Sequence, residues 1–245
     1  MDQISCRLLP FSVADGAHNM AADESLLGSA IAGVASLRFY GWSEATLSLG
    51  YFQRARARNT QPNLAALPFV RRPSGGGALV HHHEVTYALA LPAGRPWQTG
   101  ESWLCRMHEI IAGVLRSLGV FVRDCVGTGT APSDRFLCFA KLTPGDLLID
   151  SVKIVGSAQR RQRGALLQHG AILLAASPHA PVLPGIRELT GLSLSVEETC
   201  QTVAMEFARK TGWHLHSQQW TLAELDQTRE LVHTKYSQES WNCKR

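Results

Sequence analysis

The segment from residue 71 to residue 92, RRPSGGGALVHHHEVTYALALP, concentrates residue types that can hold a ligand. Three consecutive glycines allow backbone N–H groups to approach an anion or a carbonyl, because no Cβ stands in the way. A hairpin turn would need one or two such positions and would not need Arg71, Arg72 and Ser74 beside them. The segment lacks the Lys-Ser/Thr pair of a phosphate-binding P-loop and the G-x-G-x-x-G spacing of a dinucleotide site. It therefore favours a substrate-cradling loop over a simple turn.

Three histidines follow the glycines. On a strand, His81 and His83 would share one face and His82 would take the other. A metal site would need a third ligand, and Glu84, the obvious carboxylate, would lie on the opposite face from His81. The sequence therefore indicates no metal site and favours His81 as a hydrogen-bonding wall of a pocket. The roles of His82 and His83 stay open, with exposed polar positions as the simplest interpretation.

A lysine and a cysteine could carry chemistry further along the chain. Lys153 lies in the apolar run SVKIVGSA, where a strand lysine usually faces solvent. The residues Gly156-Ser157-Ala158 follow it and leave room for a ligand. An ammonium beside such a cleft can polarise a carbonyl or favour a thiolate. Cys138, in RFLCFAKLTPGD, has two interpretations, a buried inert thiol, which is the usual case, and a nucleophile.

Composition narrows the function classes. The chain has 245 residues, of which 45% are hydrophobic and 18% charged, an ordinary globular composition. Its six cysteines show no C-x-x-C pairing, and no apolar run or export-like N-terminus is present, so we expect a cytoplasmic protein that neither spans nor binds a membrane. Two basic clusters, at 53–58 and 159–163, lack interleaved aromatic residues, and we therefore expect no nucleic-acid binding.

Helical spacing predicts helices at 19–33 and 101–119 and after the capping residues Ser195 and Thr221. In the first of these, Asn19 is the expected N-cap. Asp23 and Glu24 would then interact favourably with the positive end of the helix dipole.

Short β-branched or aromatic runs predict strands at 35–42, at 45–52, up to Val70, from Ala78, on both sides of Asp150–Ser151, and at 164–175. In the strand that begins near Ala78, the alternation from Val85 to Leu91 leaves both faces apolar, which is typical of a central strand. Three prolines in 177–186 predict an irregular loop. Strands and helices mix without strict alternation, which favours an α+β domain with a mixed sheet over a doubly wound one.

Four segments occur in the order of the motifs of a known superfamily: NMAADESLL, LSLGYFQ, VRRPSGGGALVHHHEVTYAL and KIVGSAQRRQRGALLQHGAILL. The chain resembles the lipoate–protein ligase/octanoyltransferase superfamily over roughly residues 19–194, with biotin–protein ligases as more distant relatives. The resemblance implies one catalytic domain over 1–245, an α+β fold with a mixed β-sheet flanked by helices and a short C-terminal helical segment at about 195–235. It also implies a medium-chain acyl group bound in a tunnel.

The resemblance also implies roles for individual residues. Cys138 stands in an LCF segment fifteen residues before Lys153, similar to the thioester-forming cysteine in one group of octanoyltransferases, so Cys138 and Lys153 are the expected catalytic residues. No metal ligand is expected. The expected substrate-binding residues are Arg71, Arg72, Ser74, Gly75, Gly76, Gly77, Ala78, His81, Tyr87, Gly156, Ser157, Ala158, Gln159, His169 and Gly170.

The implied reaction moves an octanoyl group from acyl carrier protein, through the cysteine, to a lysine of lipoyl domains of 2-oxoacid dehydrogenases or of the glycine-cleavage H protein, without a cofactor. An ATP- and Mg-dependent lipoate–protein ligase, an octanoyl amidotransferase and a non-catalytic acyl-binding protein stay open as alternatives. The unbroken triple glycine is ligase-like, and FAKLTPGD departs from the transferases' usual run. Only 75 residues follow Gly170, which leaves hardly any room for the C-terminal domain of many ligases, although some carry it on a separate chain.

Overall fold

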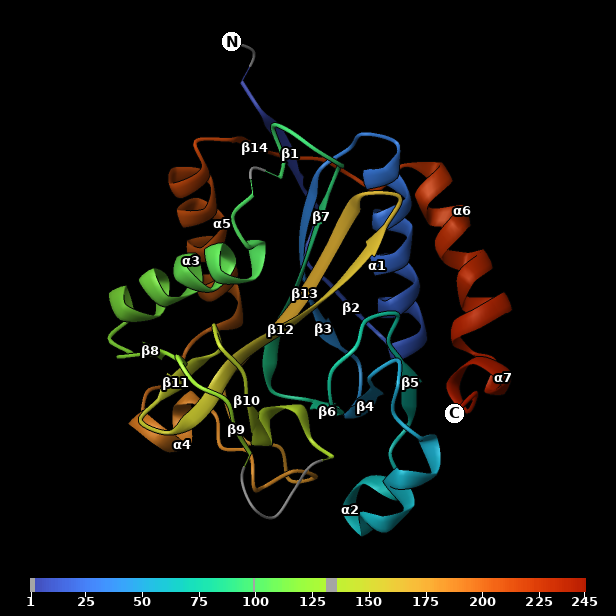
Figure 1. Ribbon diagram of the computed structural model, residues 1–245, viewed down its shortest axis with the longest axis vertical. Helices are drawn as coiled ribbons and strands as arrows, with labels where there is room; N and C mark the ends of the chain where they lie inside the picture. The colour runs from blue at the N-terminus through green and yellow to red at the C-terminus, as the bar shows by residue number, and fades with distance from the viewer. Residues whose placement is uncertain (1–2, 99, 131–135) are drawn as a thin grey trace.

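The structure is a computed structural model, and residues 3–98, 100–130 and 136–245 are described. A nine-stranded mixed sheet lies between two helical layers (Figure 1). Its order is β14-β1-β3-β7-β13-β12-β11-β8, with β2 paired to β3. The strands are β1 (Ser5–Leu8), β2 (Ser12–Ala14), β3 (Ser36–Trp42), β7 (Glu84–Leu91), β8 (Arg123–Asp124), β11 (Leu147–Ile149), β12 (Val152–Gln162), β13 (Ala165–Leu173) and β14 (His214–Ser217). The expected mixed sheet flanked by helices is confirmed.

Two pairs of helices form the layers on either side of the large sheet. Figure 1 shows α3 and α5 on one side of the central strands and α1 and α6 on the other. Their bounds are α1 (Gly16–Ile31), α3 (Trp103–Ser117), α5 (Val196–Thr211) and α6 (Leu222–Leu231). The shorter elements are α2 (Pro62–Ala65), α4 (Ile186–Thr190), α7 (Glu239–Asn242), the 3₁₀ turns η1 (Ala55–Thr60) and η2 (Cys138–Ala140), and the π-helical turn η3 (Val232–Tyr236).

Two small sheets complete the fold. The first has the order β5-β4-β6, with β4 (Thr46–Leu49), β5 (Phe69–Arg71) and β6 (Leu79–His81). The second pairs β9 (Gly129–Thr130) with β10 (Lys141–Leu142). The glycine-rich segment connects β5 to β6, so both of its ends are fixed by the same small sheet.

The alternation predicted for the central strand β7 divides the hydrophobic core in two. Val85, Tyr87 and Leu89 belong to the cluster that contains residues of α3 and α5. Ala88 and Ala90 belong to the cluster under α1, where their small side chains let the helix approach the sheet. Every residue of β7 is buried. The prediction of a central strand that is apolar on both faces is confirmed.

The strand predicted to start near Ala78 is in fact two strands. β6 pairs with β4 in the small sheet, whereas β7 pairs with β3 and β13 in the large sheet. The chain bends at residues 82–83, between them. Strand alternation therefore fails across the histidines, because they do not lie on one continuous strand.

The first helix begins earlier than predicted. α1 starts at Gly16, and the side chain of Asp15 caps it by accepting a hydrogen bond from the backbone N–H of His18. Asn19 is not the N-cap. Its side-chain amide is inside the fold and donates to the carbonyls of Ala14 and Gly41. The shift by four residues moves Asp23 from the first turn of the helix to a buried position in its middle.

The segment at about 195–235 contains a strand as well as helices. β14 pairs in parallel with β1 at the edge of the large sheet. A buried ion pair holds α6 to the rest of the fold, since Glu224 lies 2.6 Å from the Arg7 guanidinium and accepts a hydrogen bond from Ser29.

None of the helices in the described ranges has the length and apolar character that a membrane-spanning helix requires.

Candidate active site

A cavity opens between the glycine-rich segment, η2 and the paired strands β12 and β13. It contains about 490 Å³ of empty space, counting its open mouth. The structure brings together at its lining the predicted residues Arg72, Gly76, His81, Cys138, Gly156, Ser157, Ala158, His169 and Gly170. The remaining lining residues are Met20, Tyr40, Leu79, Thr86, Phe139 and Ala171. Most of the lining is apolar carbon, which suits an aliphatic chain.

The glycines allow the loop to pass close to Cys138. The backbone N–H of Cys138 donates to the carbonyl of Ala78 at 2.6 Å. A Cβ on Gly77 would lie 2.9 Å from the Cys138 backbone, and a Cβ on Gly50 would lie 1.9 Å from the Gly76 carbonyl oxygen. Gly76 itself has φ +97°, a conformation that favours glycine. The half-buried thiol of Cys138 therefore depends on bare backbone at three nearby positions.

Arg72 brings a buried positive charge to the same place. Its guanidinium donates hydrogen bonds to the carbonyls of Ser48, Gly75 and Gly77 and to the Ser48 hydroxyl, all neutral oxygens. A Cβ on Gly76 would lie 3.4 Å from Arg72 Nη2 and 3.8 Å from Cys138 Sγ, so both groups adjoin one glycine. Burial lowers the pKa of Arg72, and Cys138 and Tyr40 oppose that shift. None of the ion pairs among the described residues involves Arg72.

Lys153 is buried, which rules out the solvent-facing interpretation. Its side chain is 3% exposed, and its Nζ lies 2.8 Å from Asp146 Oδ2 and 5.0 Å from the Phe139 ring centroid. A Cβ on Gly156 would lie 2.3 Å from Lys153 Cε, so the lysine occupies space that only glycine leaves free. Since Gly156 and Phe139 both line the cavity, the ammonium lies immediately behind its wall.

Asp146 was not predicted as a site residue. Its carboxylate accepts hydrogen bonds from the backbone N–H and the hydroxyl of Thr143, and the same oxygen pairs with Lys153. The local sequence TPGD resembles an ordinary turn. The signal that could have identified Asp146 is Lys153 itself, because a buried lysine requires a counter-charge.

A second unpredicted residue, Asp23, anchors His169. His169 Nδ1 lies 2.9 Å from Asp23 Oδ2, and its Nε2 lies 2.5 Å from Ser74 Oγ. Tyr40 donates to the same carboxylate, and Arg38 pairs with it at 3.3 Å. The order of hydroxyl, imidazole and carboxylate matches that of a hydrolase triad. Ser74, however, is 2% exposed and does not line the cavity, so these contacts fix the glycine loop to β13 and α1.

His81 lines the cavity, and both of its ring nitrogens have hydrogen-bonding partners. Its Nδ1 lies 2.6 Å from Glu84 Oε1 and its Nε2 lies 2.7 Å from the Ser48 hydroxyl. Its ring stacks on Trp42 with centroids 3.8 Å apart. Burial lowers the pKa of His81, and Glu84 opposes the shift. The expectation that Glu84 lies on the opposite face was wrong, because the bend at 82–83 turns the carboxylate back toward the ring.

Three predicted substrate-binding residues support the wall from outside. Gln159 donates to Gln168 at 2.7 Å, and Gln168 in turn donates to the Tyr87 hydroxyl at 2.9 Å. A Cβ on Gly170 would lie 2.7 Å from Tyr87 Cε1, so the Tyr87 ring packs directly behind Gly170. Ala78 is also buried outside the lining and contributes the carbonyl that Cys138 binds.

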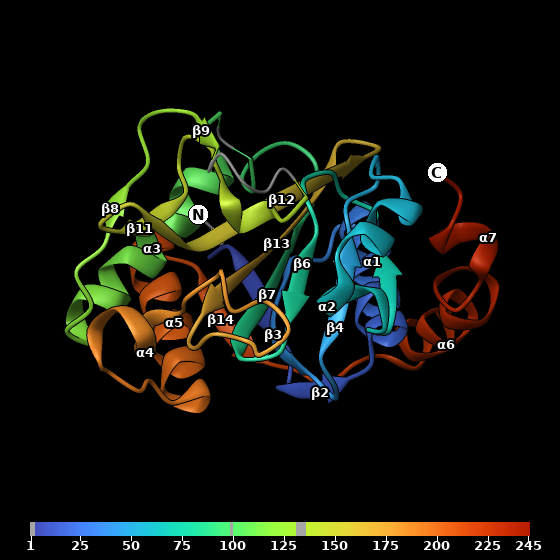
Figure 2. The same cartoon turned by 90° about the horizontal axis from the view of Figure 1, so that it is seen from below.

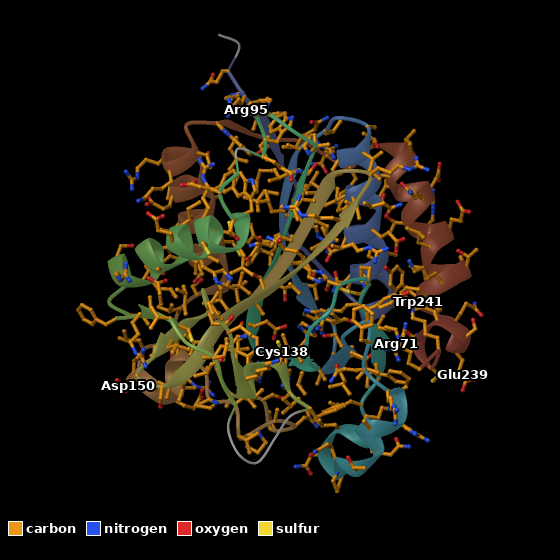
Figure 3. The ribbon with its side chains drawn as sticks, viewed as in Figure 1. Arg71, Arg95, Cys138, Asp150, Glu239 and Trp241 are labelled. Carbon is orange, nitrogen blue, oxygen red and sulfur yellow. The ribbon has the colours of Figure 1, made fainter. Side chains whose placement is uncertain are left out.

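Arg71 points away from the cavity. It is fully buried and donates to the carbonyls of five residues on two segments: Gly50, Tyr51, Gln53, Trp241 and Asn242. Figure 3 shows it on the α7 side of the fold, away from Cys138. Neighbouring residues on a strand alternate in direction. Arg71 therefore fastens the C-terminal residues to the small sheet, whereas Arg72 reaches the site.

The other two histidines lie outside the cavity. His82 and His83 stack on each other, with centroids 3.6 Å apart, and His82 Nδ1 lies 3.2 Å from the Ser177 hydroxyl. Across residues 3–98, 100–130 and 136–245, no three His, Cys, Asp or Glu side chains gather closely enough to hold a metal ion.

Comparisons with known proteins identify the family and the fold. The model of the lipoyl protein ligase A/B catalytic domain matches residues 15–183. Octanoyltransferase LipM of Kyrpidia tusciae is 36% identical, with 98% of each chain covered, and octanoyltransferase LipM of Bacillus subtilis is 31% identical, with both chains fully covered. Among solved structures, lipoate–protein ligase A bound with ATP has a TM-score of 0.79 at 23% identity, with 98% of this chain and 99% of that chain covered. The chain belongs to the lipoyl protein ligase A/B catalytic domain family.

Proposed function

We propose that this protein is an acyltransferase that moves an octanoyl group onto a specific lysine of lipoyl domains, through a thioester on Cys138. Relatives named as octanoyltransferases that match nearly the whole chain at 30% identity or more support the reaction class. The proposed donor is octanoyl-acyl carrier protein. The proposed acceptors are the lipoyl domains of 2-oxoacid dehydrogenases and the glycine-cleavage H protein, in the cytoplasm and without a cofactor.

The observation that carries the proposal is the position of Cys138 beside Arg72. A half-buried thiol borders an apolar cavity, and a guanidinium bound only to neutral oxygens adjoins the same glycine. A nearby cation stabilises a thiolate, which is the nucleophilic form. Two other thiols are less suited to this role, since burial raises the pKa of Cys6 and of Cys200 to about 12.

In the first half-reaction, the Cys138 thiolate attacks the carbonyl carbon of the octanoyl thioester. The tetrahedral intermediate carries a negative oxygen, which main-chain N–H groups of the glycine loop and the positive charge of Lys153, immediately behind the cavity wall, stabilise. The C–S bond to the carrier breaks, and the carrier leaves as a thiolate that takes a proton from water. The octanoyl group is now bound to Cys138 as a thioester.

In the second half-reaction, the neutral amine of the acceptor lysine attacks the same carbonyl. The C–N bond forms, the amine loses a proton to solvent, and Cys138 leaves as the thiolate that Arg72 stabilises. Exchange of one thioester for another changes the free energy little, and formation of an amide from a thioester lowers it. The sequence of steps therefore requires no ATP.

Mass spectrometry after incubation with octanoyl-acyl carrier protein tests the proposal. We expect one octanoyl mass on the peptide that contains Cys138 and loss of that mass when a lipoyl domain is added. Cys138→Ser should abolish the thioester, whereas Cys105→Ser, at an exposed cysteine outside the cavity lining, should leave it intact. An octanoyl-lipoyl domain as the donor would identify the amidotransferase alternative. A protein that binds octanoate, forms no adduct with either donor and modifies no lipoyl domain when Mg-ATP is added would be an acyl-binding protein.

The unbroken run Gly75–Gly77 favours a second candidate, the ATP-dependent lipoate–protein ligase. In that reaction the glycine loop would cradle the phosphate of an acyl-adenylate and Cys138 would be inert. Free octanoate with Mg-ATP would then release AMP and modify a lipoyl domain. Turnover that persists in Cys138→Ser would replace the thioester mechanism with adenylation.

A further inference from the structure

Three segments that are far apart in the sequence meet around the ring of Tyr51. Tyr51 and Phe52 follow β4, Arg160 lies on β12, and Lys244 follows α7. Lys244 Nζ lies 3.6 Å from the Tyr51 ring centroid, and Arg160 Cζ lies 6.0 Å from it. Figure 2 shows η1, the residues after α7 and the β12–β13 hairpin along the same upper edge of the molecule.

Two of the three segments at this edge contain no acidic residue. Residues 50–65 and 156–170 contain neither Asp nor Glu, and Arg54, Arg56 and Arg160 are all exposed. Among the described residues, none of the ion pairs involves these arginines or Lys244. Phe52 is 70% exposed among them. We call Tyr51, Phe52, Arg54, Arg56, Arg160 and Lys244 the Tyr51 patch.

The Tyr51 patch borders the mouth of the cavity. Gly156 and Ala158 line the cavity, and Arg160 is the next residue on the same face of β12, since side chains alternate along a strand. On the other side, the Tyr51 N–H donates to the Ser74 carbonyl at 2.8 Å. A Cβ on Gly75 would lie 3.9 Å from the Phe52 ring. The patch is thus continuous with both the glycine loop and β12.

We propose that the Tyr51 patch is the docking surface for the acidic acyl carrier protein that delivers the octanoyl thioester, an inference that rests on the proposed function. Guanidinium groups bind carboxylates and phosphates with two hydrogen bonds each, and an exposed aromatic ring among them is typical of an interface anchor. The carrier presents acidic side chains and holds its acyl group on a long arm attached through a phosphodiester. Both features complement an unpaired cluster of arginines.

The position of the patch favours the donor over the acceptor. Arg160 lies two residues beyond Ala158, at roughly 7 Å along the strand, so the patch flanks the mouth and does not cover it. A partner with a long flexible arm can dock to one side and still reach Cys138. A lipoyl domain must present a single lysine side chain and therefore has to sit directly over the opening.

Acylation of Cys138 by two donors tests the docking surface. We expect Arg160→Glu to lower the second-order rate of acylation by octanoyl-acyl carrier protein tenfold or more, the order of effect that electrostatic steering produces. Acylation by octanoyl-pantetheine, which has neither protein nor phosphate, should be unchanged. Added salt should slow the wild type and affect Arg160→Glu much less. The matched control is Arg209→Glu, on α5, where the arginine pairs with Glu206 of its own helix.

The other possible results of these experiments each support a different role for the Tyr51 patch or contradict the proposal. Equal rates with the carrier protein for wild type and Arg160→Glu would overturn the docking surface while the thioester chemistry stands. A defect confined to transfer from octanoyl-Cys138 to the lipoyl domain would assign the patch to the acceptor, and displacement of the carrier by a single-stranded oligonucleotide would assign it to nucleic acid. If the wild type forms no octanoyl adduct, the proposed function fails, and calorimetric binding of the carrier to wild type and Arg160→Glu decides the docking surface alone.

Discussion

The two sides of the cavity differ in how their charges are balanced. On the side of α1 and β13, Asp23 binds His169, Tyr40 and Arg38, and His169 in turn binds Ser74. On the side of η2, the hydrogen bonds that Arg72 makes to described residues all go to neutral oxygens, and the half-buried thiol of Cys138 faces the cavity. On the first side, the Asp23 carboxylate is paired with the side chains around it. On the second side, the Arg72 guanidinium is paired with no carboxylate among the described residues.

This difference separates the residues that hold the site from those that can react. A buried polar network with all its partners in place is rigid, and it fixes the glycine loop against the sheet. A buried cation without a counter-ion is costly, unless an anion forms beside it. A thiolate on Cys138 would be such an anion. The η2 side is therefore where substitutions should affect the rate most strongly.

The largest expected effect is at Lys153. Lys153→Met removes the ammonium and leaves the Asp146 carboxylate buried alone, so it should both destabilise the protein by about 3–5 kcal/mol and lower the rate of octanoyl transfer by roughly 10²-fold or more. The double variant Lys153→Met/Asp146→Asn removes both charges. Its stability should recover, as measured by urea unfolding, whereas its activity should stay low.

The double variant distinguishes catalysis from folding. Recovery of activity together with stability would mean that the ion pair has only a structural role. Lys153→Arg should also be a poor substitute, because the larger planar group cannot fit the space that Gly156 leaves for the lysine stem.

A smaller effect is expected at Arg72. Arg72→Gln removes the positive charge beside Cys138, so alkylation of Cys138 by iodoacetamide and its acylation by the octanoyl donor should both slow by about tenfold to a hundredfold. Arg72→Lys keeps the charge but loses the fork that holds the loop carbonyls, and it should retain an intermediate rate. The alkylation is followed by peptide mass, since Cys105 and Cys243 are exposed and react as well. Unchanged alkylation in folded Arg72→Gln would show that the thiol is not activated by this cation.

Sequence reasoning identified the candidate residues whose types or motifs are distinctive in the chain and missed the carboxylates that pair with them. The glycine loop and Lys153 stand out because their types are unusual for their positions, and Cys138 stands out through the resemblance to the thioester-forming cysteine of one group of octanoyltransferases. Asp23 and Asp146 do not, since a carboxylate near a helix start or in a turn is ordinary, and only the fold brings them to His169 and Lys153. The sequence likewise could not distinguish Arg71 from Arg72, because the role of each arginine depends on which distant segments the fold brings to its side of the strand.

Parts of the fold could also be predicted from distinctive local sequence patterns. Strong alternation in β7 and the caps at Ser195 and Thr221 correctly indicated a central strand and two helices. β14 went unpredicted because its four residues, HLHS, carry no apolar alternation and are stabilised by pairing with β1. Tertiary pairing thus overrides weak local preference.

The hydrogen-bonded network around Glu224 lies outside the cavity lining. A substitution in this network should lower the stability of the protein and leave the rate of octanoyl transfer unchanged. Burial raises the pKa of Glu224, but hydrogen bonds from Arg7, Ser29 and Thr221 outweigh it and lower the pKa to about 2. Because the pKa is depressed in the folded state, the stabilisation is fully present above about pH 4.5 and is lost as the pH falls toward 2. We expect a loss of about 3 kcal/mol in the free energy of unfolding over that range.

Urea unfolding of wild type and Glu224→Gln checks this prediction. The variant should be less stable at pH 7, and the two proteins should converge as the pH approaches 2, because protonation removes the charge that the substitution has already removed. Octanoyl transfer at pH 7 by the folded variant should equal that of the wild type. Parallel curves across the acid range would show that Glu224 does not contribute through its charge.

The smallest effect is expected at Tyr87, which lies behind the wall of the cavity. Its hydroxyl is fully buried and accepts a hydrogen bond from Gln168, and burial raises its pKa to about 12, so it stays protonated at neutral pH. Tyr87→Phe should cost about 1 kcal/mol of stability, the usual contribution of one hydrogen bond, and leave octanoyl transfer within twofold of wild type. The matched control is Tyr40→Phe, which removes the same atom from a tyrosine that lines the cavity and binds Asp23. Tyr40→Phe should lower both stability and rate, because it breaks the network that holds the glycine loop. A rate loss in Tyr87→Phe as large as that in Tyr40→Phe would place Tyr87 in contact with the acyl group and would remove the distinction between a wall that binds and a layer that supports it.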